Sequence, residues 1–193
     1  MDSARIQAAI VEILHAIGED PTRPGLAKTP QRVADAYAEF FSGLGVDPLT
    51  YLSDGVPMDG GRGELVLLRD IEFRSICEHH LLPFTGVAHV AYIPRERVVG
   101  LGRLPRVVDT LAARPQLQEH LTEQIADALQ SGLDPFGVLV VLDATHACVT
   151  ARGTRQSHSS TVTMASRGSL SEPVTRSGVL ALLGDARSVR AQK

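Results

Sequence analysis

The sequence predicts an α+β protein with a mainly antiparallel sheet. Apolar residues at helical spacing dominate the first fifty residues, whereas runs of strand-forming residues dominate from residue 64 onward. In this later part, strands follow one another around a single pair of helical stretches and do not alternate regularly with helices. That order is typical of an antiparallel sheet with helices packed on it and not of a parallel α/β fold.

The pattern divides the chain into four segments. Residues 1–53 form an arm of two amphipathic helices, and residues 54–63 form a Gly-rich linker. Residues 64–170 form the body. Residues 171–193 form a polar tail with one apolar stretch, which predicts a short helix.

The body contains five predicted strands and two predicted helices. The first helix is expected near Leu104, and the second covers about residues 116–131. Strands are predicted at 65–77, 86–94, 137–144, 145–153 and 159–166.

Composition argues against several classes of protein. A net charge of −3 over 193 residues is unlike a nucleic-acid-binding protein that works by bulk electrostatics. The longest apolar run, residues 138–142, has the length of a buried strand and not of a membrane span. The N-terminus has an acidic residue at position 2 and no signal-peptide pattern, so a cytoplasmic protein with no membrane or nucleic-acid partner is expected.

Both cysteines lie in segments that resemble metal-binding sites. Cys77 and His80 are three residues apart in CEHHLLPF, so one turn can direct both side chains at one point. Cys148 is then the third ligand, and two thiolates with one imidazole suit zinc and leave a fourth position open for water. The alternative is that the cysteines are ordinary core residues, since free cysteine is often buried. The CxxH spacing favours the metal site.

The segment THACVTARG, residues 145–153, supports the same site. If it is a strand, alternation places His146, Cys148, Thr150 and Arg152 on one face and small apolar residues on the other. An imidazole, a thiol and a guanidinium on one face indicate a functional surface.

Two histidines beside these ligands are candidate catalytic residues. Neutral imidazoles next to a zinc-activated water carry protons near neutral pH, and His79 and His146 are placed to do so. A purely hydrogen-bonding role next to the metal is the alternative for His79. His89, inside a predicted strand, is expected to be structural.

A further set of residues is typical of a site for a nucleotide phosphate. The segment GLGRLPR puts Arg103 and Arg106 on the first turn of a helix, after Leu101 and Gly102, where a ligand can approach the backbone. Helix N-termini and forked guanidinium groups bind phosphate oxygens, and Arg152 adds a third guanidinium. The chain has no P-loop motif and therefore no sign of phosphoryl transfer. The alternative is a solvated helix face that bears arginines.

Gln118 and Glu119 lie early in the second helix of the body. A carboxylate there can accept hydrogen bonds from the N1–H and N2–H₂ donors of guanine. A solvated glutamate is the alternative.

Taken together, these motifs resemble the GTP cyclohydrolase I family over about residues 5–168. The segments that carry the resemblance are AIGEDPTRPGLAKTPQRVADAYAEFFSGL, SICEHHLLPFTGVAHVAYIP, RPQLQEHLTEQIADALQ, HACVTARG and SSTVT. The tail beyond residue 168 does not share it.

The resemblance implies a tunnelling fold with two helices on one face of the sheet, assembled as a homodecamer with active sites between subunits. It implies Zn²⁺ on Cys77, His80 and Cys148. It also implies catalysis by His79 and His146. The implied substrate contacts are guanine on Glu119 with Gln118 beside it, and triphosphate on Arg103, Arg106 and Arg152 with Leu101 and Gly102.

The implied reaction opens the imidazole ring of GTP at C8, releases formate, and rearranges the ribose to close 7,8-dihydroneopterin triphosphate. Zinc lowers the pKa of its water and supplies hydroxide for this opening. One position departs from the family, because Gly102-Arg103 stands where Ser-Lys is usual. Two alternatives therefore stay open: a paralogue that uses another guanine nucleotide or stops at a ring-opened product, and a non-catalytic zinc-stabilised ring that binds a pterin or nucleotide.

Overall fold

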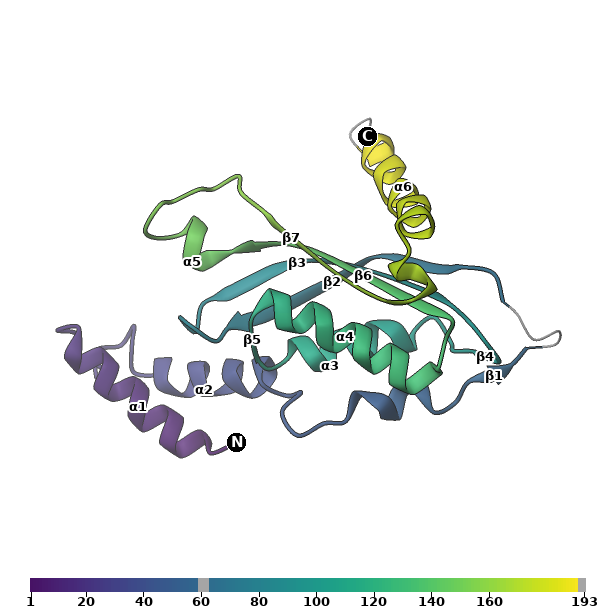
Figure 1. The fold of residues 1–193 in the computed structure, drawn as a ribbon. Coiled ribbons are helices and arrows are strands. Elements are labelled where there is room, and N and C mark those ends of the chain that lie inside the picture. The colour runs from purple at the N-terminus through teal and green to yellow at the C-terminus, as the bar shows by residue number, and fades with distance from the viewer. Residues whose placement is uncertain (59–62, 191–193) are drawn as a thin grey trace.

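The computed structural model, which describes residues 1–58 and 63–190, confirms the α+β class (Figure 1). Residues 59–62 of the predicted linker lie outside the described residues. The helices are α1 (Ser3–Ala16), α2 (Thr29–Phe40), η1 (Pro48–Leu52), α3 (Arg103–Ala112), α4 (Gln118–Leu133), α5 (Ala147–Thr150), η2 (Ser169–Ser171) and α6 (Pro173–Arg190). The strands are β1 (Val56–Pro57), β2 (Val66–Cys77), β3 (Pro83–Ile93), β4 (Arg97–Val98), β5 (Pro115–Gln116), β6 (Gly137–His146) and β7 (Thr161–Gly168).

The main sheet has the strand order β5-β2-β3-β6-β7. Its four long strands pair antiparallel, as predicted, whereas the two-residue β5 runs parallel to β2. A bulge between Leu68 and Ile71 interrupts β2, where Asp70 has a φ of 58°. The Asp70 N–H donates to His89 Nδ1 at 3.1 Å, so His89 has the structural role expected of it.

Helices α3 and α4 cover one face of this sheet, as the sequence predicts, and α6 lies on the opposite face (Figure 1). Their apolar faces explain this packing, because residues at helical spacing are buried against the strands. The buried apolar residues of α3 are Leu104, Val107, Val108, Leu111 and Ala112. Where α6 packs on the sheet, Leu139 of β6 and Val179 of α6 belong to a second, smaller cluster of buried apolar residues. Helix α6 has 18 residues and is longer than the short helix predicted for the tail.

The predicted strand at residues 145–153 is wrong. β6 ends at His146, which pairs with Phe84, and β3 begins only one residue before Phe84. Without a partner strand, the backbone satisfies its own hydrogen bonds by turning into α5, where the Ala151 N–H donates to Ala147 O at 3.0 Å. The strand alternation predicted to align His146, Cys148, Thr150 and Arg152 therefore does not exist.

The N-terminal arm joins the body through backbone contacts near its end. Gly43 accepts a hydrogen bond from Arg114 Nε at 3.0 Å, and its N–H donates to Ala113 O at 3.0 Å. A Cβ at Gly43 would lie 2.0 Å from Thr110 O, so this close approach requires glycine. On α1, Leu14 is buried, whereas Ile13 and Ile17 stay exposed in the single chain. Within the described ranges, no helix is both long enough and apolar enough to span a bilayer.

Candidate metal centre and active site

The turn between β2 and β3 positions the first two candidate ligands. Cys77 ends β2 and is buried, and its carbonyl accepts hydrogen bonds from the N–H groups of Leu81 (2.8 Å) and His80 (3.4 Å). Leu81 has a φ of 51°, a conformation uncommon for leucine, which reverses the chain toward β3. As a result His80 faces Cys77, with Nδ1 3.8 Å from Sγ.

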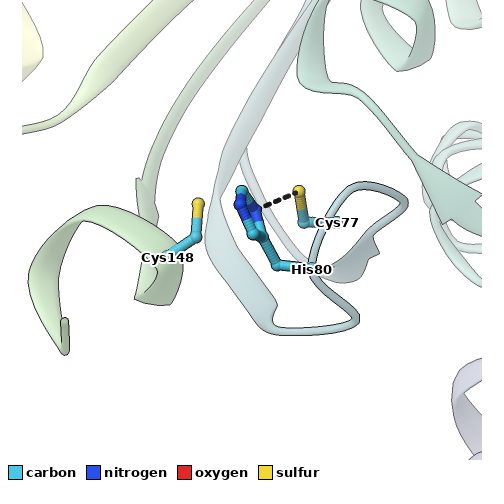
Figure 2. A group of neighbouring side chains, drawn as sticks. All are labelled: Cys77, His80 and Cys148. Carbon is cyan, nitrogen blue, oxygen red and sulfur yellow. Dashed lines mark hydrogen bonds between the residues drawn. The ribbon is translucent and has the colours of Figure 1, made fainter. Parts of the chain in front are cut away.

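Cys148 reaches the same point from α5, on the other side of His80 (Figure 2). The donor atoms of Cys77, His80 and Cys148 all lie within 4.8 Å of one another. Ligands about 2.0–2.3 Å from a tetrahedral zinc ion are about 3.5–3.8 Å apart, so small side-chain rotations bring this group to metal-binding distance. Two sulfur donors and one imidazole fit zinc, and the structure brings together the three residues that the sequence predicted as ligands.

Two effects disfavour the thiolate form of Cys148. Burial raises the pKa of the Cys148 thiol, and the neighbouring Cys77 raises it further because two thiolates repel each other. Arg152 acts in the opposite direction. A bound divalent cation would offset these costs by stabilising both thiolates at once.

His146 lies at the end of β6, two residues before Cys148, and is stacked on Phe84. The two ring centroids are 4.7 Å apart and the planes are inclined by 4°. Burial lowers the pKa of His146, while the Glu119 carboxylate raises it in part. The His146 ring is therefore held parallel to the Phe84 ring, and burial favours its neutral form. Glu119 is close enough for its charge to act on the imidazole.

His79 is exposed in the turn that carries His80. The two imidazole rings are 6.1 Å apart between centroids and inclined by 87°. His79 therefore lies next to a candidate ligand, at the surface, where a bound molecule can reach it.

Three of the predicted phosphate residues, Gly102, Arg103 and Arg106, line a cavity of about 310 Å³ together with Gly100, whereas Arg152 and Leu101 are not among its lining residues. Arg103 is the first residue of α3, as predicted, and its Nη2 donates to Asp54 Oδ2 at 2.8 Å. A Cβ at Gly102 would meet no described atom within 4 Å, so this position is open. Leu101 beside it is exposed.

Arg152 and Glu119 each lie near one residue of the candidate site. Arg152 follows α5, is exposed, and lies close enough to Cys148 for its charge to lower the thiol pKa. Glu119, in the first turn of α4, is exposed and acts on His146. Arg152 is thus near the candidate ligands, whereas Glu119 is near the candidate proton carrier.

Gln118 does not share the open surroundings of Glu119. Its side chain is 2% exposed, and its Nε2 donates to Thr161 O at 2.9 Å, to Thr163 Oγ1 at 3.1 Å and to Leu142 O at 3.3 Å. Its Oε1 is buried and has no hydrogen-bond partner among the described atoms. In this chain Gln118 holds α4 against β6 and β7, and its predicted role as a substrate contact remains a prediction.

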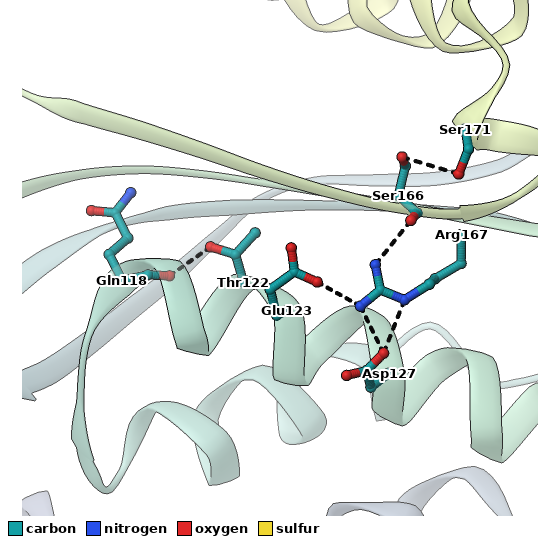
Figure 3. A network of polar contacts seen from close by, with 7 residues as sticks. All are labelled: Gln118, Thr122, Glu123, Asp127, Ser166, Arg167 and Ser171. Atoms are coloured by element: carbon teal, nitrogen blue, oxygen red, sulfur yellow. Dashed lines mark hydrogen bonds and ion pairs between the residues drawn. The ribbon is translucent and has the colours of Figure 1, made fainter.

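A second polar link fixes α4 on β7 further along (Figure 3). Arg167 donates to Asp127 Oδ1 at 2.7 and 2.9 Å and to Glu123 Oε2 at 2.5 Å. Because Arg167 lies on β7 and both carboxylates lie on α4, the helix cannot slide along the sheet without breaking these contacts. The link therefore keeps the N-terminal end of α4, with Glu119, in place.

Two residues near the site have no local signal in the sequence. Phe84 is part of an apolar run, and its place one strand across from His146 follows only once the β3–β6 register is known. Asp54 lies in the predicted linker, far in sequence from Arg103. Pairing of the strands, and not any local motif, brings these residues to the site.

Comparison with known proteins identifies the family of the chain. The family model described as GTP cyclohydrolase I matches residues 6–184, so the match includes most of the tail that the sequence resemblance left out. GTP cyclohydrolase 1 of Leifsonia xyli is 64% identical over 95% of this chain and 96% of its own. The enzyme of the same name from Carboxydothermus hydrogenoformans is 50% identical over 98% and 99%, and that of Rhodopirellula baltica is 50% identical over 97% and 82%.

Among solved structures, the apo archaeosine synthase QueF-Like matches 54% of this chain and 93% of its own, at 21% identity and a TM-score of 0.45. This likeness is too low to carry a conclusion. The extent and identity of the sequence matches are decisive: the chain belongs to the GTP cyclohydrolase I family.

Proposed function

We propose that this chain is a zinc-dependent GTP cyclohydrolase I. The reaction takes up water, opens the imidazole ring of GTP at C8, releases C8 as formate, and closes 7,8-dihydroneopterin triphosphate. Family membership supports the activity. The observation that carries the proposal is the cluster of Cys77, His80 and Cys148, with their donor atoms within 4.8 Å of one another.

The three candidate ligands would hold Zn²⁺, which when bound supplies Lewis-acid activation of water. The histidines handle protons. His146 is kept neutral by burial and oriented by Phe84, so it can accept a proton near neutral pH. His79, exposed beside His80, can donate a proton to the purine nitrogen as the ring opens.

The remaining residues would bind the nucleotide. Glu119 can accept from the N1–H and N2–H₂ groups of guanine, which would direct the base toward His146. Arg103 and Arg106, which line one cavity, and Arg152 would bind triphosphate oxygens, with the backbone of Leu101 and Gly102 close by. Gln118 would act indirectly, by holding the helix that carries Glu119.

The proposal includes assembly as a homodecamer with sites between subunits, in the cytoplasm. Exposed apolar side chains occur on the arm and on the edge strand β7, and burying them in a contact between subunits would remove their apolar surface from water. These residues are Ile13, Ile17, Val162 and Met164. The mass in solution, measured by light scattering, tests this part.

A mass-spectrometric time course with the metal-loaded protein and GTP tests the activity. Formate together with dihydroneopterin triphosphate is the expected result. Formate or a formamide without the pterin would show that Gly102-Arg103 redirects the later steps, so the chain would be a ring-opening paralogue. Unchanged GTP, also after a trial of GMP and deoxy-GTP, would contradict the enzyme and leave a nucleotide- or pterin-binding ring.

A further inference from the structure

Arg103, at the position where this chain departs from its family, is held by a carboxylate from a distant segment. Asp54 lies between η1 and β1, and its Oδ2 accepts from Arg103 Nη2 at 2.8 Å. The Arg103 side chain is 35% exposed and Asp54 is 69% exposed. Asp54 is not among the residues that line the cavity with Arg103 and Arg106, so it contacts the guanidinium from outside that cavity.

Asp54 is itself fixed in place. Ser53 Oγ lies 3.3 Å from Asp54 Oδ1, so both carboxylate oxygens have partners. Arg97 of β4 donates to Ser53 O at 3.4 Å and also donates to Gly132 O, which ties this segment to the end of α4. Just before it, Leu52 is fully buried. The carboxylate therefore extends from a supported stretch of backbone, and each of its oxygens has a partner.

The same segment also backs the second arginine of the cavity. The guanidinium carbon of Arg106 lies 6.0 Å from the centroid of the Tyr51 ring, at the outer limit of a cation–π contact. Tyr51 and Asp54 thus contact Arg106 and Arg103 respectively. One short stretch of chain supports both guanidinium groups of the cavity.

The shape of the guanidinium group allows Arg103 to contact a carboxylate and a bound anion at the same time. A guanidinium has five donors in one plane, so it can give Nη2 to a carboxylate and keep Nε and Nη1 for an anion. Arg103 makes no other side-chain hydrogen bond among the residues that the structure describes. The neighbouring Gly102 has no side chain, and a Cβ there would meet no described atom within 4 Å, so the surface beside Arg103 is open at this position.

We propose that Asp54 is a positioning residue, which orients the Arg103 guanidinium so that its free donors bind the triphosphate of the substrate. This inference rests on the proposed function, in which Arg103 is a phosphate ligand. Asp54, Gly102 and Arg103 then act as one unit in place of the Ser-Lys pair that is usual in the family.

The test compares Asp54→Ala and Asp54→Asn with the parent, using KM and kcat for GTP at about 0.1 and 0.5 M salt. We expect KM to rise about two- to fivefold in Asp54→Ala at both salt concentrations, with kcat nearly unchanged, the size expected for an exposed ion pair. Asp54→Asn, which keeps an acceptor oxygen, should show a smaller rise. The rise in KM should persist at about 0.5 M salt if Asp54 acts by orienting Arg103. If Asp54 acted only through its charge, the added salt would screen the effect.

Two controls separate orientation from other effects. Glu19→Gln breaks a comparably exposed ion pair on the arm, 2.7 Å from Arg23, and should leave KM unchanged. In an Arg103→Met background, Asp54→Ala should no longer change KM, because the guanidinium that Asp54 orients is gone. A KM that is unchanged or lower in Asp54→Ala would overturn the proposal, as would an equal rise in the Arg103→Met background.

Failure of the proposed function would look different. If the metal-loaded parent leaves GTP unchanged, calorimetric binding of inorganic tripolyphosphate to the parent and to the same variants replaces KM as the readout. If Asp54→Ala binds tripolyphosphate more weakly than the parent, and this difference disappears in the Arg103→Met background, the result would still support Asp54 as a positioning residue. Equal binding by all variants would contradict it.

Discussion

Phe84 and His146 are directly paired across the β3–β6 ladder, and their rings are stacked with centroids 4.7 Å apart and planes inclined by 4°. Phe84 is 1% exposed, so packing in the core fixes the position of its ring. The imidazole stacked on that ring is oriented by it. A candidate proton carrier at the end of a strand is thereby given one orientation before any ligand binds. Preorganised groups of this kind avoid the cost of ordering during the reaction.

We expect Phe84→Leu to lower kcat about 10- to 100-fold while the metal content stays at the level of the parent, because the imidazole loses its flat support. The free energy of unfolding should fall by about 1–2 kcal/mol from lost packing. Phe73→Leu is the matched control, since Phe73 is also buried. Its ring packs edge-on against Phe84, with ring centroids 6.0 Å apart, and does not stack on His146. Equal losses of kcat in the two variants would show that general core packing, and not the stack, is responsible.

Cys148→Ser should lose metal and activity together, since a serine hydroxyl is a poor substitute for a thiolate at a zinc site. We expect metal affinity to fall by more than about a hundredfold, as measured by metal analysis after dialysis against a weak chelator. Val149→Ala, in the same short helix, changes an exposed side chain and should retain the metal. A full complement of metal in Cys148→Ser would exclude Cys148 as a ligand.

His79→Asn should keep the metal but lower kcat about 10²- to 10⁴-fold, the range expected when a general acid is removed. The reason is geometric: His79 lies beside His80 but outside the group of converging donor atoms. His15→Asn, on the arm, serves as a control for the chemical change alone. Loss of metal from His79→Asn would indicate that His79 supports the ligands and is not a proton donor.

Gln118 should prove structural when its stability and its kinetics are measured side by side. Gln118→Glu places an oxygen against Leu142 O, Thr161 O and Thr163 Oγ1, so we expect a loss of about 2–4 kcal/mol in denaturant unfolding at pH 7. Gln118→Met leaves those acceptors without this donor but adds no charge, and it should lose about 1–3 kcal/mol. Unfolding free energies equal to that of the parent, with a raised KM for GTP, would instead support the substrate contact that the sequence predicted.

Much of the fold was predictable because it depends on local periodicity. The runs of strand-forming residues in β2 and β3 and the helical spacing of apolar residues in α3 and α4 are properties of neighbouring residues. The spacing of Cys77 and His80 was informative for the same reason, since a single turn joins them.

The sequence by itself determined the α+β class, the candidate ligands and the family motifs. Only the tertiary structure decided where β6 ends, because that depends on how far β3 extends as its partner. It also decided that Cys148 approaches from a helix, that Gln118 is buried, and that Asp54 contacts Arg103. These facts depend on contacts between segments far apart in the chain. A local pattern cannot encode such a contact, because each of the two segments is compatible with many partners until the strands are paired.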